Sequence, residues 1–219
     1  MIVSNASETT PAVPRMALPD RVGGRPALDF VNTVDPRHAP DRSDYLTSYG
    51  ALLDWVESLQ LAMPAPAGAL GRIAATEPEA AAAALERAVA LREALYRVFA
   101  TAVTRRPVSE EALAVVNTQL CQATDHHVLR PDPAGGVRDG WVGAESLDSP
   151  LWPVVIDAWD VLTTDLITRV RECPGEDQTC GWLFLDSSRS GNRRWCDMRT
   201  CGNRAKVRTH YTRHGEKQD

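Results

Sequence analysis

Four cysteines in the C-terminal part of the chain constrain its fold more than any other feature of the sequence. They form two close pairs, Cys173 with Cys180 and Cys196 with Cys201, and fifteen residues lie between the pairs. Such spacing is typical of a structural zinc module, because each short pair makes a tight turn and the intervening segment brings the turns together around one tetrahedral ion. The sequence therefore predicts one structural Zn²⁺ per chain.

Two other uses of these thiols are disfavoured. Disulfides persist in oxidising compartments, and the first twenty residues lack the basic stretch and apolar run of a signal peptide. The chain also has no run of about 18 apolar residues, so we expect a soluble, cytoplasmic protein without a membrane partner. Four independent thiols would not explain why the cysteines occur as two close pairs along the chain. Cys121 stands apart in a helical segment and is expected to be a small core residue.

A competing ligand set would combine Cys196 and Cys201 with His210 and His214, which are four residues apart. If one helix begins near Cys201, His210 lies about 13 Å further along its axis, at about 1.5 Å per residue. Two ligands of one zinc ion must lie within about 4 Å of each other. The four-cysteine set is therefore preferred.

The segment around the second cysteine pair is strongly basic. Residues 187–214 contain eight Arg or Lys residues and one acid, a charge of +7, whereas the whole chain carries −5. Zinc with four thiolates has a formal charge of −2, so the metallated segment carries about +5 on an otherwise acidic protein. This asymmetry is typical of a protein whose one end binds a polyanion. The candidate nucleic-acid contacts are Arg189, Arg193, Arg194, Arg199, Arg204, Lys206, Arg208 and Arg213.

The remaining sequence predicts a mainly α-helical protein with three parts. Residues 1–20 are expected to be a mobile arm, residues 21–170 a mostly helical domain, and residues 171–219 the zinc module. Apolar periodicity predicts helices over 43–59, 77–104, 109–124 and 150–170, and a β-hairpin over 127–142. We expect residues 20–165 to fold without metal around a core that includes Leu85, Val89, Leu95, Phe99, Trp152 and Trp159.

Signals for catalysis are weak. The chain has no GxSxG, HExxH, P-loop or dinucleotide-binding glycine pattern, so no catalytic residue is assigned and an enzyme is not expected. Asp29, Asn32 and Arg92 could line a pocket in the helical domain. Polar residues in such segments more often cap a helix or pair internally.

The C-terminal sequence resembles the CGNR zinc finger. Its naming motif is present as Cys201, Gly202, Asn203 and Arg204, preceded by Trp195-Cys196 and by the segment CGWLFLD from Cys180. Residues 24–160 are similar to the ABATE domain, chiefly through GRPALDFVNT at 24–33. The interval between Cys173 and Cys180 is longer than is common in the family. The resemblance implies a stress-induced transcription regulator with the four cysteines as ligands, a finger that binds DNA, and an upstream domain with a sensing role.

The finger is expected to be a zinc-clamped hairpin and helix, similar to a treble clef, with a small core of Trp182, Phe184 and Trp195. Gly202 is expected to allow a tight turn, and Asn203 to cap the following helix. One or two of Arg193, Arg194 and Arg204 are expected to contact the cysteine cluster instead of DNA. The favoured function is a DNA-binding transcription regulator. The alternatives are a zinc-stabilised protein-interaction adaptor and an RNA or single-strand binder. A homodimer is compatible with the sequence, which identifies no effector.

Overall fold

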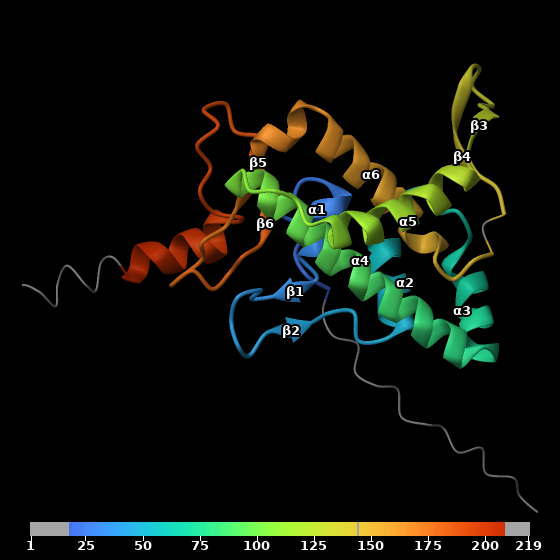
Figure 1. Ribbon diagram of the computed structural model, residues 1–219, viewed down its shortest axis with the longest axis horizontal. Helices are drawn as coiled ribbons and strands as arrows, with labels where there is room; N and C mark the ends of the chain where they lie inside the picture. The colour runs from blue at the N-terminus through green and yellow to red at the C-terminus, as the bar shows by residue number, and fades with distance from the viewer. Residues whose placement is uncertain (1–17, 144, 209–219) are drawn as a thin grey trace, which may run out of the picture.

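A 27-residue helix, α4 (Pro78–Thr104), runs diagonally through the protein and the other helices pack around it (Figure 1). The computed structural model describes residues 18–143 and 145–208. Most of the expected arm lies outside the described residues, and so do His210, Arg213 and His214. The remaining helices are α1 (Pro26–Val31), α2 (Tyr49–Ser58), α3 (Ala67–Thr76), α5 (Glu110–His126), α6 (Trp152–Thr163), the 3-10 helices η1 (Ser149–Leu151) and η2 (Asp165–Arg169), and the π-helical turn η3 (Met198–Gly202), which continues as α-helix through residue 208.

The main core lies among α1, α4, α5 and α6: α4 packs against α1 and α5, and α6 packs against the same two helices. Residues on one face of α4, among them Leu91, Leu95 and Phe99, are fully buried. Leu85 and Val89, which were expected in this core, are only partly buried. The predicted fold class, mainly helical with small two-stranded sheets, is confirmed. Trp152 is buried as expected, but Trp159 is 52% exposed and does not belong to the core.

Three antiparallel pairs of short strands lie within the described part of the chain. The hairpin expected at 127–142 is confirmed as β3 (His127–Pro131) and β4 (Val137–Trp141), which projects from the end of the protein opposite the zinc module (Figure 1). The other pairs are β1 (Val34–Asp35) with β2 (Ser43–Asp44), and β5 (Val170–Glu172) with β6 (Leu183–Leu185).

Several local expectations differ from the structure. The helix expected from residue 43 begins at Tyr49, because residues 43–44 pair with β1 and the Ser48 hydroxyl accepts the N–H of Ala51 at 3.1 Å. The helix expected to reach residue 170 ends at Thr163, and a 3-10 turn leads into β5. Cys121, expected in the core, is exposed on α5. The helix α3 was not anticipated.

The polar residues of the segment GRPALDFVNT pair inside the protein. Arg25 binds Asp157 of α6 at 2.7 Å, and the Asp29 carboxylate accepts the N–H of Gly23 at 2.8 Å. The Asn32 amide donates to the Leu183 carbonyl at 2.8 Å and accepts the Leu183 N–H at 2.9 Å. Internal pairing, and not a ligand pocket, therefore explains these residues. Arg92 behaves likewise, since its guanidinium binds the Asp44 carboxylate at 2.7 and 2.8 Å.

The β5–β6 hairpin joins the C-terminal segment to the helical body. Val170 and Leu183 belong to the main core, and the Trp182 indole donates to the Val34 carbonyl at 2.7 Å. These contacts tie residues on the C-terminal side of the expected boundary to β1 and α1. The division into separate folding units at residue 170 stays a prediction, which a chain ending near Asp165 would test.

Burial makes Asp29 a source of pH dependence. Burial raises the pKa of this carboxyl from 3.8 to about 6, although the hydrogen bond from Gly23 lowers it. The folded state therefore binds the proton more tightly than the unfolded state, and its stability falls as pH rises from about 4 to 6. We predict that Asp29→Asn, which keeps an acceptor for Gly23, is more stable than wild type at pH 7.5. The difference in unfolding free energy between this variant and wild type should be about 2 kcal/mol smaller at pH 4.5 than at pH 7.5.

Urea unfolding of both proteins at the two pH values measures this difference, and the contribution of zinc cancels between them. An advantage of Asp29→Asn that does not change with pH would contradict the prediction.

Candidate metal centre and its basic surface

The side chains of Cys173, Cys180, Cys196 and Cys201 converge at one buried point. Their Sγ atoms all lie within 4.8 Å of one another. The Cys180–Cys196 and Cys196–Cys201 separations are 3.8 and 3.7 Å. Two thiolates at tetrahedral positions on one zinc ion, each with a Zn–S bond near 2.3 Å, are about 3.8 Å apart. The donor set and its spacing therefore fit one structural Zn²⁺ with no position open for a substrate.

The electrostatics of the cluster also favour a bound cation. The three neighbouring sulfurs, followed by burial, raise the pKa of the Cys180 thiol. Four thiolates packed this closely repel one another, and a divalent cation relieves this repulsion. The arrangement holds a metal ion for structural purposes, because all four ligands are buried protein thiols.

The first two ligands are positioned by the continuation of the β5–β6 hairpin. The Cys173 N–H donates to the Trp182 carbonyl at 2.8 Å, and the Gly181 N–H donates to the Cys173 carbonyl at 3.0 Å. The six residues between the cysteines form a tight loop in which Gly175 has a φ of +60°. A Cβ atom at Gly175 would lie 2.5 Å from the Cys180 Cβ, so the loop requires glycine here.

The last two ligands flank the start of the terminal helix. The Asp197 carboxylate accepts the N–H of Arg199 at 3.0 Å and caps the helix, a role that the sequence assigned to Asn203. Gly202 was expected to allow a tight turn. Its actual constraint is packing, because a Cβ atom there would lie 2.7 Å from the Met198 sulfur and 3.2 Å from the Trp195 ring.

A small core supports the cluster, as predicted. Trp182 and Phe184 are buried with the four cysteines, and Trp195 packs against them. The Arg193 guanidinium stacks on the Phe184 ring, 4.5 Å from its centre, and donates to the Trp195 carbonyl at 2.9 Å and to the Cys196 carbonyl. Arg193 therefore fixes the segment that carries the third ligand.

Asp186, which the sequence did not single out, organises the loop before Cys196. This carboxylate is fully buried and accepts the Ser188 N–H at 2.9 Å and the Arg193 N–H at 3.0 Å. Its own N–H donates to the Arg169 carbonyl at 2.9 Å. A buried carboxylate with several backbone donors is a strong local constraint. Within the 187–195 loop, Arg189 and Arg194 are exposed, whereas the Arg193 and Trp195 side chains pack against the finger core.

The metal site is also bonded to the loop that follows β1. The Arg37 N–H donates to the carbonyl of the ligand Cys180 at 2.8 Å, and the His38 N–H donates to the Thr179 carbonyl at 3.0 Å. The Arg37 side chain is buried and its guanidinium binds Glu93 of α4 at 2.8 Å. No sequence pattern connects positions so far apart, so this contact could not be predicted from the sequence.

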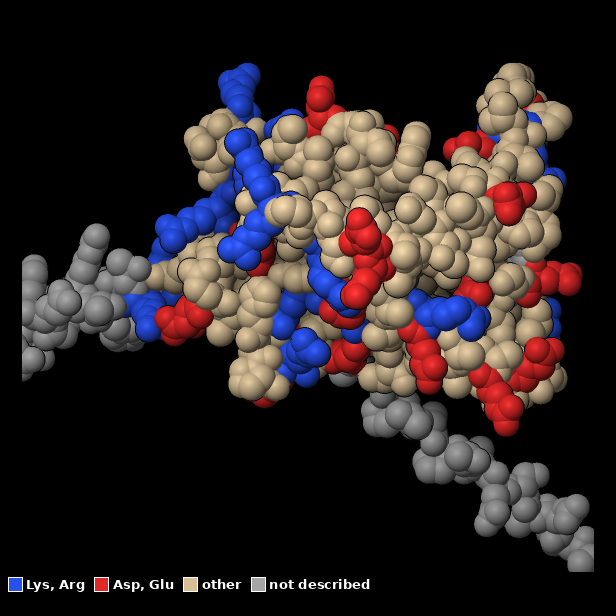
Figure 2. All heavy atoms as spheres, in the orientation of Figure 1, with Lys and Arg blue, Asp and Glu red and all other residues tan. Residues whose placement is uncertain are grey.

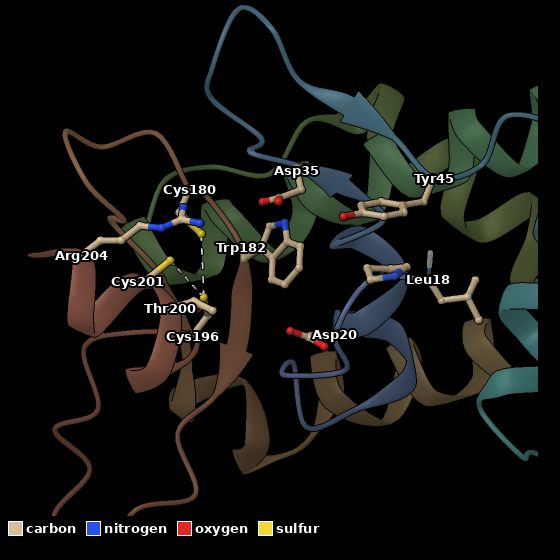
Figure 3. Close-up of a pocket in the computed structure, with 11 residues that line it drawn as sticks. Leu18, Asp20, Asp35, Tyr45, Cys180, Trp182, Cys196, Thr200, Cys201 and Arg204 are labelled. Atoms are coloured by element: carbon tan, nitrogen blue, oxygen red, sulfur yellow. Dashed lines mark hydrogen bonds between the residues drawn. The ribbon is translucent and has the colours of Figure 1, made fainter. Parts of the chain in front are cut away.

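A cavity of about 210 Å³ lies beside the cluster, between the finger and the helical body. Figure 3 shows the Trp182 indole at its centre, with Asp35 and Asp20 on either side and the Arg204 guanidinium near Cys180. Burial, followed by the Cys201 sulfur, raises the pKa of Asp35, and Arg204 opposes this effect. Tyr45 also lines the cavity.

The structure distinguishes the candidate nucleic-acid residues by their contacts. Arg208 forms ion pairs with Asp177 and with Glu176, within the finger, and Arg193 is used internally. Arg194 is exposed and lies 4.9 Å above the Trp195 ring. Arg199 is 92% exposed, with Asp197 at 3.7 Å. Arg189 and Lys206 are exposed and form no ion pair with any described residue.

Lys and Arg side chains gather over the end of the protein that contains the finger (Figure 2). The side chains of Arg189, Arg194, Arg199 and Lys206 are therefore exposed to solvent. Those of Arg193 and Arg208 are bound to other groups of the finger. Arg213 lies outside the described residues.

We predict that the purified protein contains one zinc ion per chain and that Cys196→Ser loses it. Removal of one thiolate from a closed tetrahedral site weakens binding by orders of magnitude, because structural zinc contributes about 10–16 kcal/mol to folding of such modules. Cys121→Ser is the matched control, since Cys121 is exposed on α5. Elemental analysis after gel filtration measures the metal content. Full zinc occupancy in Cys196→Ser, or zinc loss in Cys121→Ser, would contradict this ligand assignment.

Comparison with known proteins agrees with this geometry. Residues 24–165 match the model of the ABATE family, described as "Putative stress-induced transcription regulator", and residues 169–214 match the CGNR zinc finger. Neither description is that of an enzyme. No curated protein is significantly similar to the chain. Among the described residues, no helix is long and apolar enough to cross a membrane. Because the first match covers more than half of the sequence, the chain belongs to the ABATE family and carries a CGNR zinc finger after the ABATE domain.

Proposed function

We propose that this protein is a transcription regulator that binds double-stranded DNA through its zinc finger. The family description supports the regulatory role, and the charge of the finger supports the polyanion partner. The observation that carries the proposal is the set of exposed basic side chains around the metal centre, Arg189, Arg194, Arg199 and Lys206.

The finger has the properties of a rigid platform for phosphate contacts. Asp186 and Arg193 fix the 187–195 loop from inside, so Arg189 and Arg194 project from an ordered backbone. The four-thiolate centre leaves the ion no catalytic position. A guanidinium can donate two parallel hydrogen bonds to a phosphate, or to a guanine edge in the major groove. Most of these side chains would contact phosphates, with one or two reading bases.

The DNA proposal predicts a strong dependence on salt. Neutralisation of four to six phosphates gives a slope of log Kobs against log salt between about −4 and −5. Arg189→Ala combined with Arg194→Ala should reduce the magnitude of this slope by about 2 without loss of zinc. Arg208→Ala is the control, because its guanidinium is paired with Asp177 and Glu176. Fluorescence anisotropy with labelled duplexes, across a salt titration, measures the slopes.

Other outcomes separate the alternatives. Undetectable duplex binding at low salt, by zinc-loaded and folded protein, would contradict the proposal and favour the protein-interaction adaptor. Tighter binding to single strands or RNA than to duplex would favour the third candidate function.

We further propose that the ABATE domain senses a small cationic molecule at the cavity beside the metal centre. Asp20, Asp35 and a zinc–thiolate centre of formal charge −2 surround this cavity, and Arg204 is the one basic residue among the described residues that line it. The Trp182 and Tyr45 rings offer faces for a cation. A ligand there would contact the helical body and the finger together, so binding would change how firmly the finger is held.

This proposal predicts that a small diamine such as putrescine raises the melting temperature of the zinc-loaded protein by a few degrees. Ligand binding to the folded state stabilises it by mass action. Asp35→Asn should abolish most of the shift, whereas Asp139→Asn, on the distant hairpin, should retain it. An equal shift in both variants would show nonspecific binding and contradict the assignment.

A further inference from the structure

Three arginines at the end of α4 form a second basic group, outside the finger. Arg97 lies in the last turns of α4, and Arg105 and Arg106 follow in the turn that connects α4 to α5. All three are exposed, and none forms an ion pair with a described residue. Arg97 donates only to the backbone carbonyl of Glu93, at 3.3 Å. Their charges are therefore available to a partner.

This group lies beside the finger and on the same side of the protein. The C-terminal end of α4 lies in front of β5, the strand that leads to the first zinc ligand (Figure 1). The Tyr96 hydroxyl, one residue before Arg97, donates to Glu172 of β5 at 3.1 Å. In Figure 2 the Lys and Arg side chains continue from the finger across the end of α4, whereas Asp and Glu are more frequent toward the opposite end.

The surface beside Arg97 and Arg106 is hollowed. These two residues line an open depression of about 370 Å³, whose remaining lining is mostly apolar, and the Thr101 and Thr104 hydroxyls there donate to carbonyls of α4. The guanidinium groups at its edge are therefore the groups that would contact DNA phosphates. Acids flank this basic surface on two sides: Glu110 and Glu111 belong to the first turn of α5, and Glu93, one turn before Arg97, is bound by Arg37 and Arg92.

We propose that the α4–α5 turn is a second contact for the same DNA duplex that the finger binds. The inference rests on the DNA-binding function proposed above and extends it to the ABATE domain. A duplex carries one charge per about 1.7 Å of its axis, so it presents phosphates continuously to a basic surface that spans both parts of the protein. The Arg37 N–H bond to the Cys180 carbonyl and the buried contacts of Asn32 and Trp182 hold the finger on the helical body. The two basic groups would therefore bind as one unit.

The test compares three double variants of the full-length, zinc-loaded protein. Arg97→Gln with Arg106→Gln removes two charges from the α4–α5 group and avoids Arg105, whose left-handed backbone (φ 53°) makes substitution less neutral. Arg189→Gln with Arg194→Gln removes two charges from the finger. Arg72→Gln with Arg138→Gln is the matched control, since these exposed residues lie on α3 and β4, away from the finger.

Binding of a 30-base-pair duplex across a salt titration, together with zinc content and far-UV circular dichroism, provides the readout. We expect Arg97→Gln/Arg106→Gln to reduce the magnitude of the salt slope by about 2 and the affinity in 0.1 M salt by at least about tenfold, with zinc and fold unchanged. The control double variant should match wild type.

The outcomes distinguish this inference from the proposed function. Wild-type affinity and slope in Arg97→Gln/Arg106→Gln, while Arg189→Gln/Arg194→Gln is weakened, would overturn the inference and leave finger-mediated binding intact. An equal loss in the control variant would also overturn it, because overall charge would then explain the effect. Absence of duplex binding by the wild-type protein would overturn both.

Discussion

The shared coordination of one zinc ion by four buried thiolates is the interaction on which the finger, the last quarter of the chain, depends. The β5–β6 hairpin is only three residue pairs long, and the finger core consists of two buried aromatic rings and a third that packs against them. Elements this small do not bury enough apolar surface to remain folded alone. The ion joins a loop, a strand end and a helix start, and thereby fixes the backbone from which the basic side chains project.

Buried hydrogen bonds also join the finger to the helical body. The backbone of the ligand Cys180 accepts the N–H of Arg37, and Leu183 forms paired bonds with the Asn32 side chain. Each group is buried, so loss of either partner would leave an unsatisfied polar atom at a cost of about 1–3 kcal/mol. Asn32, in the ABATE segment GRPALDFVNT, thus bonds the finger directly to the helical body.

Local signals in the sequence were sufficient to predict the clustering of the four cysteines, the helix α4 and the β3–β4 hairpin. Cysteine spacing, apolar periodicity and the Ser109 cap act over a few residues, so they can be recognised without the tertiary fold. The contacts of Asn32 with Leu183 and of Trp182 with Val34 join positions about 150 apart in the chain, and no local pattern encodes them. The predicted start of α2 was wrong because Ser43 and Asp44 pair with β1. The predicted burial of Cys121 was wrong because a small apolar side chain fits either face of α5.

Hydrogen exchange before and after removal of zinc by a chelator measures whether the ion organises both the finger and its attachment. The Arg37 and His38 amides, which donate to Cys180 and Thr179, should lose protection together with the amides of the finger. Amides in the middle of α4, around Leu91 and Leu95, should remain protected at first. Unchanged protection at Arg37 and His38 in fully zinc-free protein would show that the finger holds its position without the metal, and would contradict the central role given to the four thiolates.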